Sequence, residues 1–168
     1  MTDRFQTCIA FVLEHETEYD AHGQARCEHD PNDPGGDTKY GIDQRSHPHI
    51  KVCDLTLEQA RQIYHDDEWT RCRCDDLGAP WDLAVFDAAV NLGKGWAVPA
   101  LQGVVGVTAD GFIGPKSIAA VKASSIVGVE RYLIARESHY RSLRLTLRQR
   151  YLKGWLARVS DLRKAIAA

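Results

Sequence analysis

The sequence predicts a predominantly helical α+β fold that contains one small β-hairpin. Apolar residues recur at three- and four-residue steps over most of the chain, alternation of apolar and polar residues is confined to one short stretch, and no internal repeat or low-complexity tract is present. With 168 residues, of which 44% are hydrophobic and 26% charged, the chain is long enough to bury a core of its own. We therefore expect a single domain over residues 1–168, with an N-terminal half (1–80) and a helical C-terminal half (81–168).

The first helix is expected to end at a glutamate. Its apolar stripe consists of Phe5, Cys8, Ile9, Val12 and Leu13. Glu16 follows three and four residues after the last two members, so its side chain continues the same face. The predicted helix has about 14 residues, close to four turns.

A loop and a hairpin are expected after this helix. Residues 19–34 are rich in Asp, His, Gly, Asn and Pro, which is typical of a loop. Two glycines at 35 and 36, followed by alternation through Thr38, Tyr40 and Ile42, predict a hairpin at about 37–43.

The remaining segments are predicted to be helical. Thr56 and Gln59 form a capping-box pattern, and Pro115 suits the first turn of a helix. Further helices are expected at 81–93, at 97–105, along a face from Ile126 to Tyr151 that is broken near Arg136 and Glu137, and finally around Trp155–Leu162.

The basic residues gather near the C-terminus. Residues 131–168 contain ten Lys and Arg against two acidic residues, whereas the rest of the chain contains 11 against 21. A solvated helix face is the commoner explanation of such a cluster, and attraction to an anionic envelope surface is the alternative. Nucleic acid is not expected as a partner, because no recognised binding motif accompanies the charge.

The cysteines and histidines do not predict a metal centre. The five cysteines lie at irregular spacing, and Cys27 near His29 and Cys72 near Cys74 fit the usual zinc-ligand spacing poorly. The start of the chain shows no apolar signal segment, so reduced thiols are expected. We expect neither a metal nor another cofactor.

Glu16 is the leading candidate for acid catalysis. Partial burial and the negative end of the helix dipole both favour its protonated form, which a glycosidase needs to protonate a leaving oxygen. The alternative is an ordinary solvated glutamate, which is commoner at a helix end. The segment from Asp33 to Ile42 combines an acid, turn glycines and Thr38, an arrangement in which Asp33 and Thr38 would hold a water on the far face of a sugar. A plain hairpin with a capping aspartate is the competing interpretation.

These residues together resemble glycoside hydrolase family 108. Glu16 with Tyr19, and then Asp-Pro-Gly-Gly-x-Thr-x-x-Gly-Ile at 33–42, are similar to the family signature. The likeness continues through Ala60-Arg61-Gln62-Ile63-Tyr64 with Trp69, Phe86-Asp87, Asn91-Leu92-Gly93, Leu101-Gln102, 110–117, Gly154-Trp155 and Arg158-Val159. Nearly the whole chain is covered, in the family's order.

The resemblance implies a lysozyme-like fold and a peptidoglycan hydrolase, specifically an N-acetylmuramidase of the phage-endolysin or secretion-associated kind. It implies a catalytic half at 1–80 and a peptidoglycan-binding half at 81–168. Glu16 would be the catalytic acid, with Asp33 and Thr38 as the supporting pair. The candidate substrate-binding residues are Tyr19, Tyr40, Asn91 and Gln102.

Two features depart from the family pattern. Thr17-Glu18 replaces two glycines that usually follow the glutamate, and the loop from Asp20 to Glu28 is longer than usual. The first feature is expected to alter the backbone behind Glu16, and the second to alter access to the cleft.

Two other functions remain open from the sequence. A non-catalytic peptidoglycan-binding or assembly protein would share the fold, and a wall peptide-cleaving endopeptidase would need grouped metal ligands or a reactive cysteine. For the muramidase we expect a monomer, synthesised in the cytoplasm and released to the periplasm and cell wall by a holin or a secretion system.

Overall fold

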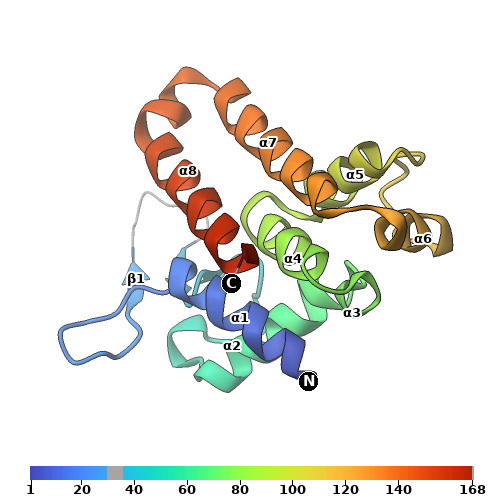
Figure 1. The fold of residues 1–168 in the computed structure, drawn as a ribbon. Coiled ribbons are helices and arrows are strands. Elements are labelled where there is room, and N and C mark those ends of the chain that lie inside the picture. Colours follow the sequence, from blue (N-terminus) through green and yellow to red (C-terminus); the bar gives the residue numbers. More distant parts are fainter. Residues whose placement is uncertain (30–35, 168) are drawn as a thin grey trace. The chain divides into compact units, whose positions relative to one another are not determined.

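The computed structural model describes residues 1–29 and 36–167, and within this part the chain is mainly helical with one small antiparallel sheet (Figure 1). Contacts divide the chain into two compact units, residues 1–67 and 68–168. No helix in the described part is long and apolar enough to cross a membrane.

The first unit contains two helices and the sheet. Helix α1 (Asp3–Glu16) is capped by Thr2, whose side chain accepts a hydrogen bond from the Phe5 amide, and its buried face is the predicted stripe. Helix α2 (Leu57–Tyr64) begins with the predicted capping box of Thr56 and Gln59. Between them lie β1 (Cys27–His29), β2 (Asp37–Lys39), β3 (Ile42–Asp43) and the short 3-10 helix η1 (Val52–Asp54).

The sheet has the order β1-β2-β3, with β2 in the centre. Strands β2 and β3 form the predicted hairpin, in which Lys39 pairs with Ile42. Strand β1 was not predicted, because the loop was expected to extend over it. Three residues without apolar alternation carry no local strand signal, and β1 exists through its pairing with β2, where Cys27 lies opposite Lys39.

All the secondary-structure elements of the second unit are helices in its described residues. After the π-helical segment η2 (His65–Trp69), it contains α3 (Cys74–Leu77), α4 (Trp81–Leu92), α5 (Lys94–Val105), α6 (Pro115–Ala123), α7 (Ile126–Ser142) and α8 (Leu145–Ala167). Helix α4 is buried along its whole first part, from Trp81 to Ala89, as a central helix must be. Pro115 occupies the first turn of α6 as predicted.

Two boundaries differ from the prediction. Helix α5 starts at Lys94, three residues earlier than expected. The long apolar face from Ile126 to Tyr151 belongs to two helices, because the chain turns at Leu143 and Arg144. The Ser142 hydroxyl donates to the His139 carbonyl (2.7 Å) at this point, a local bond that competes with the helix.

Arg136 does not break the buried face of α7. Its side chain is fully buried, and its Nη1 donates to the Asp87 carboxylate (2.5 Å). Arg158 of α8, 7% exposed, donates to the other oxygen of Asp87 through Nε (2.9 Å) and Nη2 (2.7 Å). An arginine inside an apolar pattern therefore marks a buried ion-pair network here, which links α4, α7 and α8.

Candidate active site

Glu16 is the last residue of α1, and it is half-buried. The helix ends because Thr17 adopts an extended conformation (φ −105°, ψ 121°) while its amide still donates to the Leu13 carbonyl (3.0 Å). Thr17 is itself buried, whereas Glu14 and Glu18 are exposed. Of the three glutamates around this helix end, only Glu16 is directed toward the interior of the unit.

The turn between β2 and β3 packs directly against Glu16. Tyr40 and Gly41 both have left-handed backbone angles (φ 56° and 77°). A Cβ atom on Gly41 would lie 2.8 Å from the Glu16 Cβ and 3.0 Å from its Oε2. Only glycine therefore permits this approach, both because of its φ and because the space is filled by the glutamate.

Tyr64 of α2 holds the same turn. Its hydroxyl donates a 2.8 Å hydrogen bond to the Tyr40 carbonyl, and it would lie 2.7 Å from a Cβ on Gly41. In the sequence, Tyr64 stands out only as the last residue of the family-like motif at 60–64. Its role in positioning the turn depends on a contact across 24 residues, for which no local pattern exists.

We expect Gly41→Ala to reduce wall lysis at least tenfold and to destabilise the protein by about 2–4 kcal/mol, because strain at positive φ adds to the overlap with Glu16. Gly23→Ala is the matched control, since Gly23 also has a positive φ (74°) but nothing within 4 Å of the added atom. Urea unfolding and turbidity loss of outer-membrane-stripped cells measure the two effects. Equal behaviour of the two variants would contradict the packing described here.

Thr38 lies in the central strand, and Asp33 lies outside the described residues. Thr38 is half-buried and is paired with Glu28 on one side and Asp43 on the other. Residues directly opposite each other on paired strands have their side chains on the same face of the sheet, so Glu28 and Asp43 share a face with Thr38. Residues with carboxyl groups thus flank Thr38 on both sides, a pairing that depends on strand register and that no local sequence pattern predicts.

Asp43 is tied into the turn that follows β3. Its two carboxylate oxygens accept hydrogen bonds from the Ser46 amide (2.9 Å) and hydroxyl (2.7 Å). Burial acts to raise the pKa of Asp43, but these hydrogen bonds and the charges of His47 and Arg45 outweigh it and hold the pKa below its ordinary value. Asp43 is therefore an ionised group beside Thr38, with its oxygens already engaged in the turn.

Tyr19 lies at the base of the long loop that follows α1. Tyr19 is 54% exposed and forms an isolated bridge with Ala25. The Asp20 carboxylate accepts hydrogen bonds from the amides of His22 (2.8 Å) and Gln24 (2.9 Å), which closes the tip of the loop.

The structure shows why Thr17 and Glu18 fit at positions where the family pattern has glycines. The extended φ of Thr17 is one that any residue adopts, so this backbone does not require glycine. The Glu18 side chain is 65% exposed and lies 3.9 Å from Arg26, so its charge is solvated and partly balanced.

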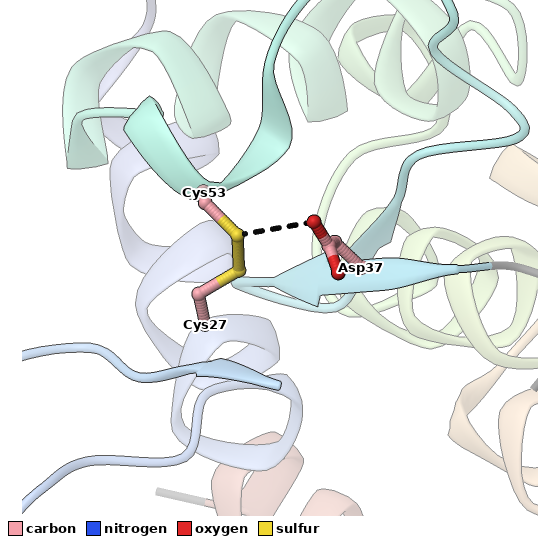
Figure 2. A group of neighbouring side chains, drawn as sticks. All are labelled: Cys27, Asp37 and Cys53. Carbon is pink, nitrogen blue, oxygen red and sulfur yellow. Dashed lines mark hydrogen bonds between the residues drawn. A yellow bond between two sulfur atoms is a disulfide. The ribbon is translucent and has the colours of Figure 1, made fainter. Parts of the chain in front are cut away.

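The face of the sheet opposite to Thr38 carries a disulfide bond, which no pattern in the sequence predicted. Cys27 of β1 and Cys53 of η1 are bonded, with Cα atoms 5.2 Å apart (Figure 2). The expectation of reduced thiols was wrong for this pair, whereas Cys8, Cys72 and Cys74 are buried and lie outside the disulfide. Twenty-six residues separate the bonded cysteines, so only the folded sheet brings them together.

A contact from β2 anchors the segment that carries Cys53. The Lys39 ammonium donates to the carbonyls of Cys53 (3.0 Å) and Leu55 (2.9 Å). Lys39 and Asp37 therefore face the disulfide, and Thr38 between them faces the other side of the sheet.

Beside the disulfide, three side chains bring together atoms of the kind that bind metal ions. The ligand atoms of Cys27, Asp37 and Cys53 lie within 4.8 Å of one another, and the Asp37 carboxylate is 3.5 Å from the Cys53 sulfur. Because the two sulfurs are bonded to each other, neither is available as a thiolate ligand. In this state the group does not form a metal site.

In the second unit, Gln102 of α5 is buried against the loop that joins α5 to α6 (residues 106–114) and is not displayed on the surface. It is 1% exposed, and its Nε2 donates to Asp110 Oδ1 (2.7 Å), the Phe112 carbonyl (3.0 Å) and Ser117 Oγ (3.2 Å). Its Oε1 accepts from the Gly111 amide (2.9 Å). The hydrogen bonds from Gln102 and then from the Phe112 amide lower the pKa of Asp110. Gln102 thus shapes this loop from within.

The loop borders an open depression of about 450 Å³. Asp110, Phe112 and Ser117 are among its lining residues, and Phe112 is 78% exposed. Asn91, the other candidate of this unit, is half-buried and accepts a hydrogen bond from the Tyr140 hydroxyl. The six candidate residues that the structure describes divide between the two units. The first unit contains Glu16, Tyr19, Thr38 and Tyr40, and the second contains Asn91 and Gln102.

A glutamate that ends a helix against the turn of a small antiparallel sheet, in a mainly helical chain, is the arrangement of a lysozyme-like glycoside hydrolase. Comparison with known proteins agrees: residues 9–93 match the family described as glycosyl hydrolase 108, and residues 96–160 match a predicted peptidoglycan domain. The chain belongs to the glycosyl hydrolase 108 family, and it is a peptidoglycan-degrading glycosidase.

A solved structure supports the same assignment. The structure of Brucella abortus SagA is 32% identical to this chain and superimposes with a TM-score of 0.81, covering 98% of this chain and 94% of that one. No curated protein matches the chain.

Proposed function

We propose that the chain is an N-acetylmuramidase, which hydrolyses the β-1,4 bond between N-acetylmuramic acid and N-acetylglucosamine. The observation that supports this most directly is the placement of Glu16, half-buried at the end of α1 and packed against the Gly41 turn. A carboxyl group enclosed in this way is suited to act as a general acid.

In the proposed reaction, Glu16 donates its proton to the glycosidic oxygen, and the bond from that oxygen to C1 of N-acetylmuramic acid breaks. A water molecule supplies the oxygen that bonds to C1, and its proton passes to a base. Asp33 and Thr38 are proposed to hold and activate this water. The products are a muramic acid with a free reducing end and a glucosamine with a free 4-hydroxyl.

Glycan binding is proposed to involve both units. Tyr19 and Tyr40 are the proposed sugar contacts of the first unit, since aromatic rings stack well on the apolar faces of sugars. In the second unit, we propose that Gln102 acts indirectly, by shaping the loop that displays Phe112, and that Asn91 orients Tyr140.

Mass analysis of digested peptidoglycan tests the proposed bond specificity. We expect fragments that end in reducing N-acetylmuramic acid. Fragments that end in reducing N-acetylglucosamine would show that the other glycosidic bond is cut, free stem peptides would indicate an endopeptidase, and the absence of products would indicate a binding protein.

We also propose where the enzyme acts. Its substrate lies in the cell wall, so we propose release to the periplasm by a holin or a secretion system, with lysis of the cell as one outcome. The cationic segment 131–168 is proposed to favour contact with an anionic envelope surface, and the protein is proposed to act as a monomer.

A further inference from the structure

In the structure, some of the ten cations in residues 131–168 are paired with acidic side chains and the others are not. Arg136 and Arg158 are buried against Asp87. Two further cations are engaged by acidic side chains: Arg163 donates to Glu130 (2.8 Å) and Glu137 (2.5 Å), and Lys164 pairs with Asp161 (2.8 Å). Four of the ten cations in residues 131–168 are therefore paired with acidic side chains.

Five of the six other cations lie around the turn between α7 and α8, from the end of α7 to the third turn of α8. We call residues 141–153 the α7–α8 tip; it contains Arg141, Arg144, Arg148, Arg150 and Lys153 and no acidic residue. In the described part of the chain, no acidic side chain forms an ion pair with any of these five. The tip thus carries five positive charges over 13 residues.

The same tip exposes apolar side chains. Leu145 is 59% exposed, Leu147 42% and Tyr151 40%. Leu147 and Tyr151 are four residues apart on α8, so they form a stripe on one side of the helix, and Arg148 and Arg150 flank this stripe. Exposed leucines beside unpaired arginines are typical of an interfacial amphipathic helix.

Aromatic packing connects the tip to the rest of the unit. The Tyr151 ring stacks on Trp155 with centroids 5.6 Å apart, and Trp155 stacks on Tyr140 at 5.0 Å. The Arg150 guanidinium lies 5.1 Å from the centre of the Tyr151 ring. The apolar stripe is therefore held in place by the buried part of α7 and α8.

We propose that the α7–α8 tip docks on an anionic lipid bilayer. A bilayer surface offers both anionic headgroups for the arginines and hydrocarbon for the stripe of Leu147 and Tyr151 and, separately, for Leu145 at the first residue of α8. A soluble anionic wall polymer matches the charge alone and leaves the leucines in water, and a second copy of the tip would be repelled by its five like charges. The proposal concerns binding and does not depend on the chemistry of Glu16.

Co-sedimentation with lipid vesicles tests the proposal, with the Glu16→Gln protein measured in parallel so that binding is separated from catalysis. We expect binding to vesicles of phosphatidylcholine and phosphatidylglycerol, and little binding to phosphatidylcholine alone. The triple variant Arg144→Gln, Arg148→Gln, Arg150→Gln should lower partitioning about 100-fold, because each basic side chain near such a surface contributes roughly a factor of five. The double variant Leu145→Ser, Leu147→Ser should lower it about tenfold.

Matched controls lie elsewhere on the same unit. Lys116→Gln, Lys122→Gln, Arg131→Gln removes three exposed charges outside the tip, and Ile126→Ser, Ile134→Ser removes two side chains that are 59% and 50% exposed. Both should bind vesicles within about twofold of the parent, since scattered surface residues contribute little.

Three results would overturn the proposal. Binding unchanged by the leucine substitutions, while the arginine substitutions abolish it, would indicate a purely anionic polymer as the partner. Vesicle binding weakened equally by the control variants would mean that the tip is not the site. A change of molecular mass in sedimentation velocity on mutation of the tip would indicate an interface between copies.

Discussion

Glu16→Gln is expected to reduce the rate of wall lysis by about 10²–10⁴, the usual contribution of a positioned general acid. Glutamine has the same shape as glutamate, so it fits beneath the Gly41 turn, but it cannot donate the proton that the leaving oxygen needs. Circular dichroism and wall binding should be unchanged, and turbidity loss of outer-membrane-stripped cells measures the rate.

Glu14 and Glu18 provide matched controls for this experiment. Both are exposed, and the side chain of Glu18 lies beside Arg26 in solvent. Glu14→Gln and Glu18→Gln should therefore lyse cells at close to the parent rate. A Glu16→Gln protein with full activity would disprove the proposed mechanism, and an inactive Glu14 or Glu18 variant would show that the acid had been misassigned.

Asp87→Asn is expected to destabilise the protein by about 3–5 kcal/mol, because it leaves two buried guanidinium groups without a counter-charge. Asp87 and Arg136 are fully buried, and Arg158 is 7% exposed. Arg136 also donates to the Tyr140 hydroxyl (2.7 Å), so the loss would extend to the contact between Tyr140 and Asn91. Urea unfolding, monitored by tryptophan fluorescence, measures the change.

An exposed ion pair provides the control for this prediction. Asp76 accepts a hydrogen bond from Arg73 (2.8 Å), and the two side chains are 46% and 45% exposed. Asp76→Asn should cost at most about 1 kcal/mol, because solvent screens such pairs. If Asp87→Asn were no more destabilising than Asp76→Asn, the buried network would not contribute as described.

The same network predicts how stability depends on pH. Burial raises the pKa of Asp87, but the charges and hydrogen bonds of Arg136 and Arg158 outweigh it, and the pKa falls below the ordinary value of 3.8. The stabilisation is therefore fully present above the pKa of the unfolded chain and is lost as the pH falls through the lower pKa of the folded state. Asp87→Asn should abolish this part of the acid sensitivity.

Features that depend on neighbouring residues could be predicted from the sequence. The apolar stripe that ends at Glu16, the capping box at Thr56 and Gln59, and Pro115 at the start of α6 all follow from patterns within a few residues. The glycines at 35 and 36 and the alternation from Thr38 to Ile42 predicted the hairpin, and the likeness of the sequence motifs to the family predicted the enzyme class. The catalytic roles of Glu16, Asp33 and Thr38 stay predictions.

Contacts between residues that are distant in the sequence could not be predicted and became visible only in the fold. Strand β1 and the bond from Cys27 to Cys53 require the sheet to form first, and the Tyr64 hydroxyl reaches a carbonyl 24 residues away. Arg158 meets Asp87 across 71 residues, so a basic residue in the sequence became part of the core.

Periodicity, caps and motifs are properties of short segments, and they predicted most of the helices, the hairpin, the family and the position of the candidate acid. Only the fold determined which charges are buried, which cysteines are joined and which cations remain exposed at the α7–α8 tip. Ion pairs, disulfides and burial depend on which segments pack together, and no short segment of the sequence contains that information.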